Sequence, residues 1–163
     1  MSFLMASLQH YQRLVQSHPY SFNSAQSAVL MAIGDGVAQT LEVRSGKQAE
    51  YDGARLLILT SWASGVNAPF WTWWYRVLHA RWQGGKVLGW VLASASLSPF
   101  WNGAFFCYTT TATHLVKQQE GCLRAKLEHK ISTQLVPTVL KSCMLWIPFN
   151  YVRGGGRAAH YTR

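Results

Sequence analysis

The order of apolar and polar positions divides the chain into long uncharged stretches joined by short charged segments. The clearest stretch, residues 56–75, contains no Asp, Glu, Lys, Arg or His and is bracketed by Arg55 and Arg76. Because a helix rises about 1.5 Å per residue, about 20 mainly apolar residues cross the hydrocarbon core of a bilayer. Residues 56–75 are therefore predicted to form a membrane-spanning helix whose flanking arginines reach the headgroups.

The longest uncharged stretch, residues 87–116, contains no Asp, Glu, Lys or Arg and has Pro99 near its middle. It is longer than one crossing requires, and a proline removes a backbone donor and bends a helix. This stretch is predicted to be a span that tilts, kinks or extends beyond the bilayer.

Two further spans are predicted, each with polar interruptions. Residues 22–41 follow Pro19 and carry one acid, Asp35, and residues 132–152 carry Lys141 and two prolines. Together, the four stretches predict an all-α fold, an integral membrane bundle of about four transmembrane helices with short polar loops.

The whole chain, residues 1–163, is predicted to form a single membrane domain. Apolar residues recur at helical spacing within residues 3–16, which predicts an interfacial helix at the N-terminus. Residues 153–163 contain three consecutive glycines and are predicted to be a flexible tail. The connections are placed at residues 42–55, 76–86 and 117–130, and the third is also compatible with a short amphipathic helix on the surface.

The composition agrees with a membrane environment. Hydrophobic residues make up 49% of the chain and charged residues 13%, whereas about 25% of a soluble domain is charged. The eight Trp, seven Tyr and seven Phe exceed what a small core buries, and aromatic rings favour the membrane interface. The Lys and Arg that give the net charge of +9 are spread through short connecting segments and form no basic run, so nucleic acid is not an expected partner.

Asp35 is the most informative polar residue, because an ionisable group inside an apolar span is costly and faces a bundle interior or a watery cavity. On a helix, Gln39 falls on the same side as Asp35. Two interpretations stay open: Asp35 fixes helix packing, or it lines a pore. A continuous wet path would favour the pore, and a dry, paired carboxylate would favour packing.

A second polar stripe lies within the 87–116 stretch and allows the same two interpretations. Its side chains fall within an arc of about 100° on a helix. They could line a wet path, or they could bond to neighbouring helices and to their own carbonyls. The stripe consists of Ser94, Ser98, Asn102, Thr109 and Thr113.

The entrance and the end of the 56–75 span have features of their own. Asp52 and Arg55, three residues apart, are expected to cap the helix start and to pair. Trp74 and Tyr75 close the span within an aromatic cluster that is expected to anchor it at the interface.

No catalytic pattern is present in the sequence. It contains no G-x-S-x-G motif, no phosphate-binding loop and no His/Glu metal motif, and its six histidines are scattered singly. The three cysteines form no C-x-x-C pair. We therefore expect no enzymatic activity, no catalytic residue, no metal site and no bound cofactor.

The chain resembles the family of the twenty-two-kilodalton peroxisomal membrane protein and its mitochondrial inner-membrane relatives, the Mpv-seventeen family. The matching residues run from the N-terminal third into the third predicted span, while the C-terminal third departs from the family pattern except near Pro148. The residues that carry the resemblance include Gly34, Asp35, Asp52, Arg55, Pro69, Trp74, Tyr75 and Pro148.

This resemblance implies a four-span organellar membrane protein without an agreed enzymatic reaction or cofactor. Some members of the family are described as small pores linked to mitochondrial homeostasis. The expected location is the mitochondrial inner membrane, with the peroxisomal membrane as the alternative. The expected function is a small channel or a membrane-homeostasis protein, and the alternative is a structural subunit of a larger membrane complex. The expected partners are the lipid bilayer and either further copies of the chain or other membrane subunits.

Overall fold

The computed structural model describes residues 9–158 apart from residues 12, 14, 82–86 and 119. Every regular element in this described part is helical, so the predicted all-α class is confirmed. Most of the predicted interfacial helix at residues 3–16 lies outside the described residues, as does the end of the predicted tail at residues 159–163.

None of the helices in the described part combines the length and the apolar character that a membrane crossing demands.

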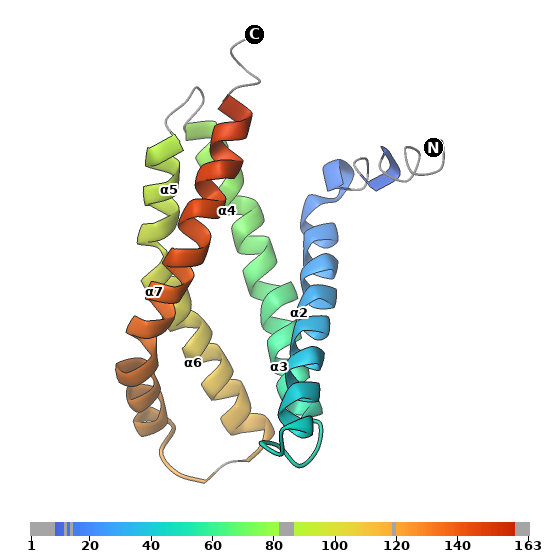
Figure 1. Cartoon of the computed structure of the whole chain (residues 1–163), viewed down its shortest axis with the longest axis vertical. Coiled ribbons are helices and arrows are strands. Elements are labelled where there is room, and N and C mark those ends of the chain that lie inside the picture. The colour runs from blue at the N-terminus through green and yellow to red at the C-terminus, as the bar shows by residue number, and fades with distance from the viewer. Residues whose placement is uncertain (1–8, 12, 14, 82–86, 119, 159–163) are drawn as a thin grey trace. The chain divides into compact units, whose positions relative to one another are not determined.

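The chain divides into two compact units, Met1–Trp74 and Tyr75–Arg163. The single membrane domain stays a prediction. Figure 1 shows both units, with α2 and α3 in the first unit and α5, α6 and α7 in the second. The boundary falls within helix α4, Ala68–Arg81, at the aromatic end of the 56–75 stretch.

The first unit is built on α2, Pro19–Arg44, which contains the predicted 22–41 stretch. Pro19 suits the first turn, because the N–H that it lacks has no partner within a helix there. After Arg44 the chain turns through Gly46, whose φ of 72° lies in the left-handed region that glycine adopts without strain. The chain then returns along α2 as α3, Gly53–Trp62 (Figure 1).

A π-helical turn, η1 at Ala63–Asn67, separates α3 from α4, so three helical segments cover the predicted 56–75 stretch. Pro69 is the second residue of α4, which begins directly after this turn. A proline cannot donate a backbone hydrogen bond, and its ring crowds the carbonyl four residues earlier, here that of Gly65. The wider π turn accommodates both effects, which accounts for the interruption of the helix at this point.

In the second unit, α5 (Val87–Ser96) and α6 (Ser98–Val116) divide the predicted 87–116 stretch between them. Pro99 lies in the first turn of α6, where proline is tolerated. Both helices pack against α7, Leu123–Ala158.

Helix α7 differs from the expectation for the C-terminal third. The segment from residue 123 to residue 130 was assigned to a connection, with a short amphipathic helix as the alternative. It is helical, but as the first turns of the long α7, and this helix continues through residues 153–158 of the predicted tail. The Arg124–Glu128 ion pair, one helical turn apart, supports the first turns. At the other end, extending an existing helix costs less than starting one, which offsets part of the cost of three glycines.

Apolar residues such as Trp62 and Leu78 are buried, but polar side chains are buried beside them and many large apolar side chains are exposed. The buried residues include the polar Asp35, Gln39 and Thr109. Large apolar residues lie outside, and on α2 they form a stripe with a spacing of four, in which Val29, Ile33, Val37 and Leu41 are between 56% and 61% exposed. A second exposed stripe on α7 contains Val136, Leu140 and Met144.

Candidate functional site

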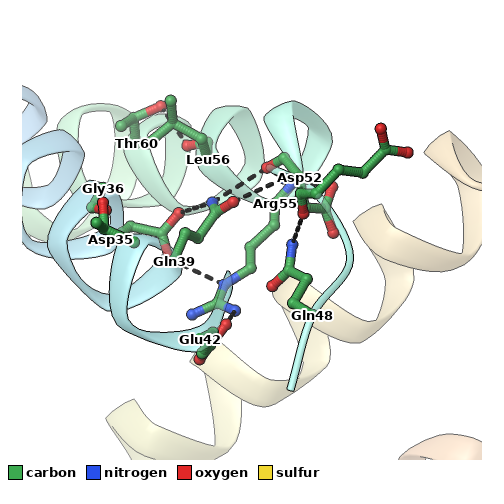
Figure 2. Close-up of polar contacts among 11 residues, drawn as sticks. Asp35, Gly36, Gln39, Glu42, Gln48, Asp52, Arg55, Leu56 and Thr60 are labelled. Atoms are coloured by element: carbon green, nitrogen blue, oxygen red, sulfur yellow. Dashed lines mark hydrogen bonds and ion pairs between the residues drawn. The ribbon is translucent and has the colours of Figure 1, made fainter. Parts of the chain in front are cut away.

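The candidate site is a polar cluster that joins α2 to the start of α3 within the first unit (Figure 2). Its centre is the Asp35 carboxylate, whose side chain is 2% exposed. The Arg55 guanidinium reaches it from α3, with 2.9 Å between Nε and Asp35 Oδ1. The buried carboxylate is therefore neutralised by a cation from the neighbouring helix.

Gln39 occupies the other side of the same carboxylate. Its Nε2 donates to Asp35 Oδ2 at 2.6 Å and lies 3.2 Å from the carbonyl oxygen of Asp52. Its Oε1 accepts the backbone N–H of Asp52 at 2.6 Å. The fully buried amide thus bonds to both the N–H and the carbonyl of one backbone residue in the α2–α3 connection.

The charge of Arg55 is shared between two acids. Arg55 Nη1 donates to Glu42 Oε2 at 2.7 Å, while Nε holds Asp35. The hydrogen bond to Glu42 raises the pKa of Arg55 above its ordinary value, partial burial opposes the rise, and Coulomb attraction to both acids adds to it. Arg55 therefore remains charged and bridges the buried end of the cluster to its half-exposed end.

The expected cap at the start of α3 is present. Asp52 Oδ1 accepts the backbone N–H of Arg55 at 3.0 Å, as an N-cap side chain does. A second contact, 2.6 Å between the hydroxyl groups of Thr40 and Tyr51, ties α2 to the connection nearby. The cluster thus fixes the α2–α3 turn through both backbone and side-chain bonds.

The glycines beside Asp35 do not mediate close contact between helices in this structure. A Cβ added at Gly34 or Gly36 would meet nothing within 4 Å, and α2 runs through both positions without a break. Instead, Gly34 and Asp35 border an open cleft of about 350 Å³ between α2 and the α3–η1 segment, with Ala63 and Asn67 on its other wall.

The polar stripe of the second unit bonds mainly to its own helix. Asn102 Nδ2 donates to the carbonyl oxygen of Ser98 at 2.8 Å and to Ser98 Oγ at 3.2 Å, and the buried Thr109 donates to the carbonyl of Phe105 at 2.8 Å. Ser94 belongs to α5, and its side chain lies outside the described residues. Asp35 and Gln39 belong to the first unit and the stripe to the second.

The remaining motif residues lie away from the cluster. Trp74 stacks on Phe70 with 6.4 Å between ring centroids and 8° between ring planes, inside an aromatic group that includes Trp73. Tyr75 begins the second unit, and Pro148 lies inside α7. No three or more His, Cys, Asp or Glu residues in the described ranges are grouped so that they could hold a metal ion.

One member of the cluster, Glu42, was not predicted from the sequence, where it was assigned to a connection. Its spacing from Asp35 and Gln39 could have identified it. Residues 35, 39 and 42 follow the helical period, so Glu42 falls on the same face of α2 as Asp35 and Gln39.

Comparisons with known proteins give relatives along most of the chain. Mitochondrial inner membrane protein Mpv17 of Bos taurus is 28% identical over 157 residues, which cover 90% of this chain and 87% of that protein. PXMP2/4 family protein 4 of Dictyostelium discoideum is 21% identical over 88% of this chain and 76% of its own length. Protein SYM1 of Debaryomyces hansenii is 40% identical over 76 residues, which span only 35% of that protein.

No protein-family model and no solved structure matches the chain.

These relatives support an organellar membrane protein. Its similarity to Mpv17, SYM1 and PXMP2/4 family proteins supports membership of the Mpv17/PXMP2 family.

Proposed function

We propose that this chain is a multi-pass, non-enzymatic protein of the mitochondrial inner membrane that serves membrane homeostasis as a structural component of a membrane assembly. Its partners in this proposal are the lipid bilayer and either further copies of the chain or other membrane subunits. The names of two relatives, mitochondrial inner membrane protein Mpv17 and PXMP2/4 family protein 4, support an organellar membrane, and the first of them specifies the mitochondrial inner membrane.

The exposed apolar stripe on α2 supports insertion into the membrane. A helix of a water-soluble bundle turns its apolar face towards the core. Here Val29, Ile33, Val37 and Leu41 face outwards, while Asp35 and Gln39 of the same helix are buried. Contiguous exposed apolar surface of this kind requires lipid or another protein to cover it.

The observation that carries the structural role is the state of the Asp35 carboxylate. It is 2% exposed, with Arg55 Nε on one oxygen and Gln39 Nε2 on the other. A group that lines a water-filled path needs access to water, whereas these contacts leave the carboxylate dry and paired. The geometry therefore favours a packing role for Asp35.

A small pore is the second candidate, and one observation favours it. The open cleft beside Asp35 has polar side chains on both walls, Ser27 on α2 and Asn67 on η1. A path that includes this cleft would pass close to the carboxylate, so the charge of Asp35 would influence which ions pass.

Cysteine labelling in reconstituted vesicles tests the insertion into the membrane. In a chain whose three cysteines are replaced by serine, we expect Ile33→Cys and Val37→Cys to react with a water-soluble maleimide about tenfold more slowly than in detergent, because the hydrocarbon core excludes the reagent.

Ala49→Cys, exposed in the connection between α2 and α3, provides the matched control and should react readily in the vesicles. Equal labelling rates at all three positions in intact vesicles would refute membrane insertion of α2.

A further inference from the structure

The net charge of the protein belongs entirely to its second unit. Residues 1–74 contain four Lys or Arg and four Asp or Glu, whereas residues 75–163 contain eleven Lys or Arg and two Asp or Glu. The second unit therefore carries the whole excess of +9, and it has few acids with which its cations can pair.

Lys130 is the cation of this unit whose environment is most unusual. Its Nζ lies 5.6 Å from the centroid of the Phe106 ring, so α7 places the ammonium over an aromatic face of α6. Burial lowers the pKa of Lys130. Among the described residues, Arg124 of the same helix pairs with Glu128 and Lys126 donates to the carbonyl of Glu120, but Lys130 has no such anionic or carbonyl partner.

Two buried polar atoms lie on the same face of α6 as Phe106. Thr110 Oγ1 and His114 Nδ1 are both inaccessible to solvent and have no hydrogen-bond partner in the described part of the chain. Steps of four residues advance only about 40° around a helix, so Phe106, Thr110 and His114 follow one line along α6. Phe106 meets α7 through Lys130, and Thr110 and His114 follow about one and about two turns further along α6 from this contact.

Leaving buried polar groups unpaired is costly, and most buried groups in proteins are satisfied. Thr109 illustrates the alternative, because its hydroxyl donates to the carbonyl of Phe105. The two unsatisfied atoms and the Lys130 ammonium share one property. An ammonium, a hydroxyl and an imidazole nitrogen in the appropriate tautomer are all donors.

We propose that Lys130, Thr110 and His114 form a binding site for a phosphate group between α6 and α7. A phosphate oxygen accepts hydrogen bonds from all three donors, and its negative charge neutralises the ammonium. The phosphate can come from the headgroup of an anionic phospholipid or from a free phosphate ion.

The predicted membrane spans favour the headgroup, and this part of the inference depends on the proposed insertion into the membrane. Thr110 and His114 lie near the end of the predicted span 87–116, and Lys130 lies just before the predicted span 132–152. Both spans therefore place the donors at the depth of the headgroups, where basic pockets between helices bind anionic lipids.

The test measures binding to the full-length chain with two probes. Native mass spectrometry in a mixture of phosphatidylcholine and phosphatidylglycerol reports the headgroup, and calorimetric titration with inorganic phosphate in detergent reports the free ion. We expect phosphatidylglycerol to bind in preference to phosphatidylcholine, and Lys130→Gln to weaken that binding about tenfold, as for the loss of a charge-assisted hydrogen bond.

Lys141→Gln is the matched control, because it removes the same charge from an exposed position on α7 and should bind as the wild type does. Thr110→Val should weaken binding without lowering the melting temperature, since the hydroxyl has no partner in the unliganded protein. A melting temperature that falls with the affinity would indicate a structural role for Thr110 instead.

The lipid and inorganic phosphate probes distinguish a headgroup from a free phosphate ion as the ligand. Inorganic phosphate that binds in a Lys130-dependent way, without preference for phosphatidylglycerol, would identify free phosphate as the ligand. It would support the site even if the labelling of Ile33→Cys refuted membrane insertion. Absence of binding with both probes, or equal losses in Lys130→Gln and Lys141→Gln, would overturn the proposal.

Discussion

Replacing Arg55 with glutamine is expected to lower the free energy of unfolding by about 3 kcal/mol, because removing one partner of a buried ion pair leaves the other charge uncompensated. The remaining charge is that of Asp35, whose side chain is 2% exposed and whose Oδ1 lies 2.9 Å from Arg55 Nε. Denaturant unfolding of the purified chain in mild detergent, followed by the circular dichroism of the helices, measures the loss.

Two further variants make this result specific. The double variant Asp35→Asn/Arg55→Gln should recover part of the stability, because it removes the buried charge together with its partner. Arg124→Gln breaks an ion pair whose side chains are 85% and 65% exposed, and it should cost less than about 1 kcal/mol. Equal losses of unfolding free energy in Arg55→Gln and Arg124→Gln would contradict the claim that the Asp35–Arg55 pair stabilises the fold.

Gln39→Leu is expected to cost about 3 kcal/mol, because it leaves buried hydrogen-bonding groups without partners. The substitution removes the donor to Asp35 Oδ2 and the acceptor of the Asp52 N–H, and leucine supplies neither. Gln26→Leu, at an exposed position on the same helix, is the control and should leave the stability nearly unchanged. The same denaturant titration compares the two, and a small effect of Gln39→Leu would mean that the amide does not hold the α2–α3 turn.

The part of the cluster that lies on one helix could be predicted from the sequence. Asp35 and Gln39 are four residues apart, so their common face follows from helical geometry alone. Their pairing with Arg55 depends on the return of α3 along α2, which is a tertiary contact that no local pattern specifies. The sequence therefore suggested that Asp35 needs a partner but did not identify it.

The helix boundaries could not be predicted from hydropathy alone. The π turn before Pro69 interrupts an uncharged stretch that reads as one helix, because hydropathy does not register the backbone crowding at a proline. At the start of α7, by contrast, the structure has a helix where a connection was predicted. Its charged residues were compatible with a connection or a short surface helix, and Arg124 and Glu128 stabilise a helical turn there by pairing with each other.

The central claim is that Asp35 holds two helices together and does not line a path for ions. The direct measurement is the conductance of planar bilayers that contain the purified wild-type protein or the Asp35→Asn variant, after circular dichroism has shown that both are folded. Our account predicts either no conductance, or a conductance whose ion selectivity is the same in both proteins. A wild-type conductance whose ion selectivity changes when the charge of Asp35 is removed would contradict it.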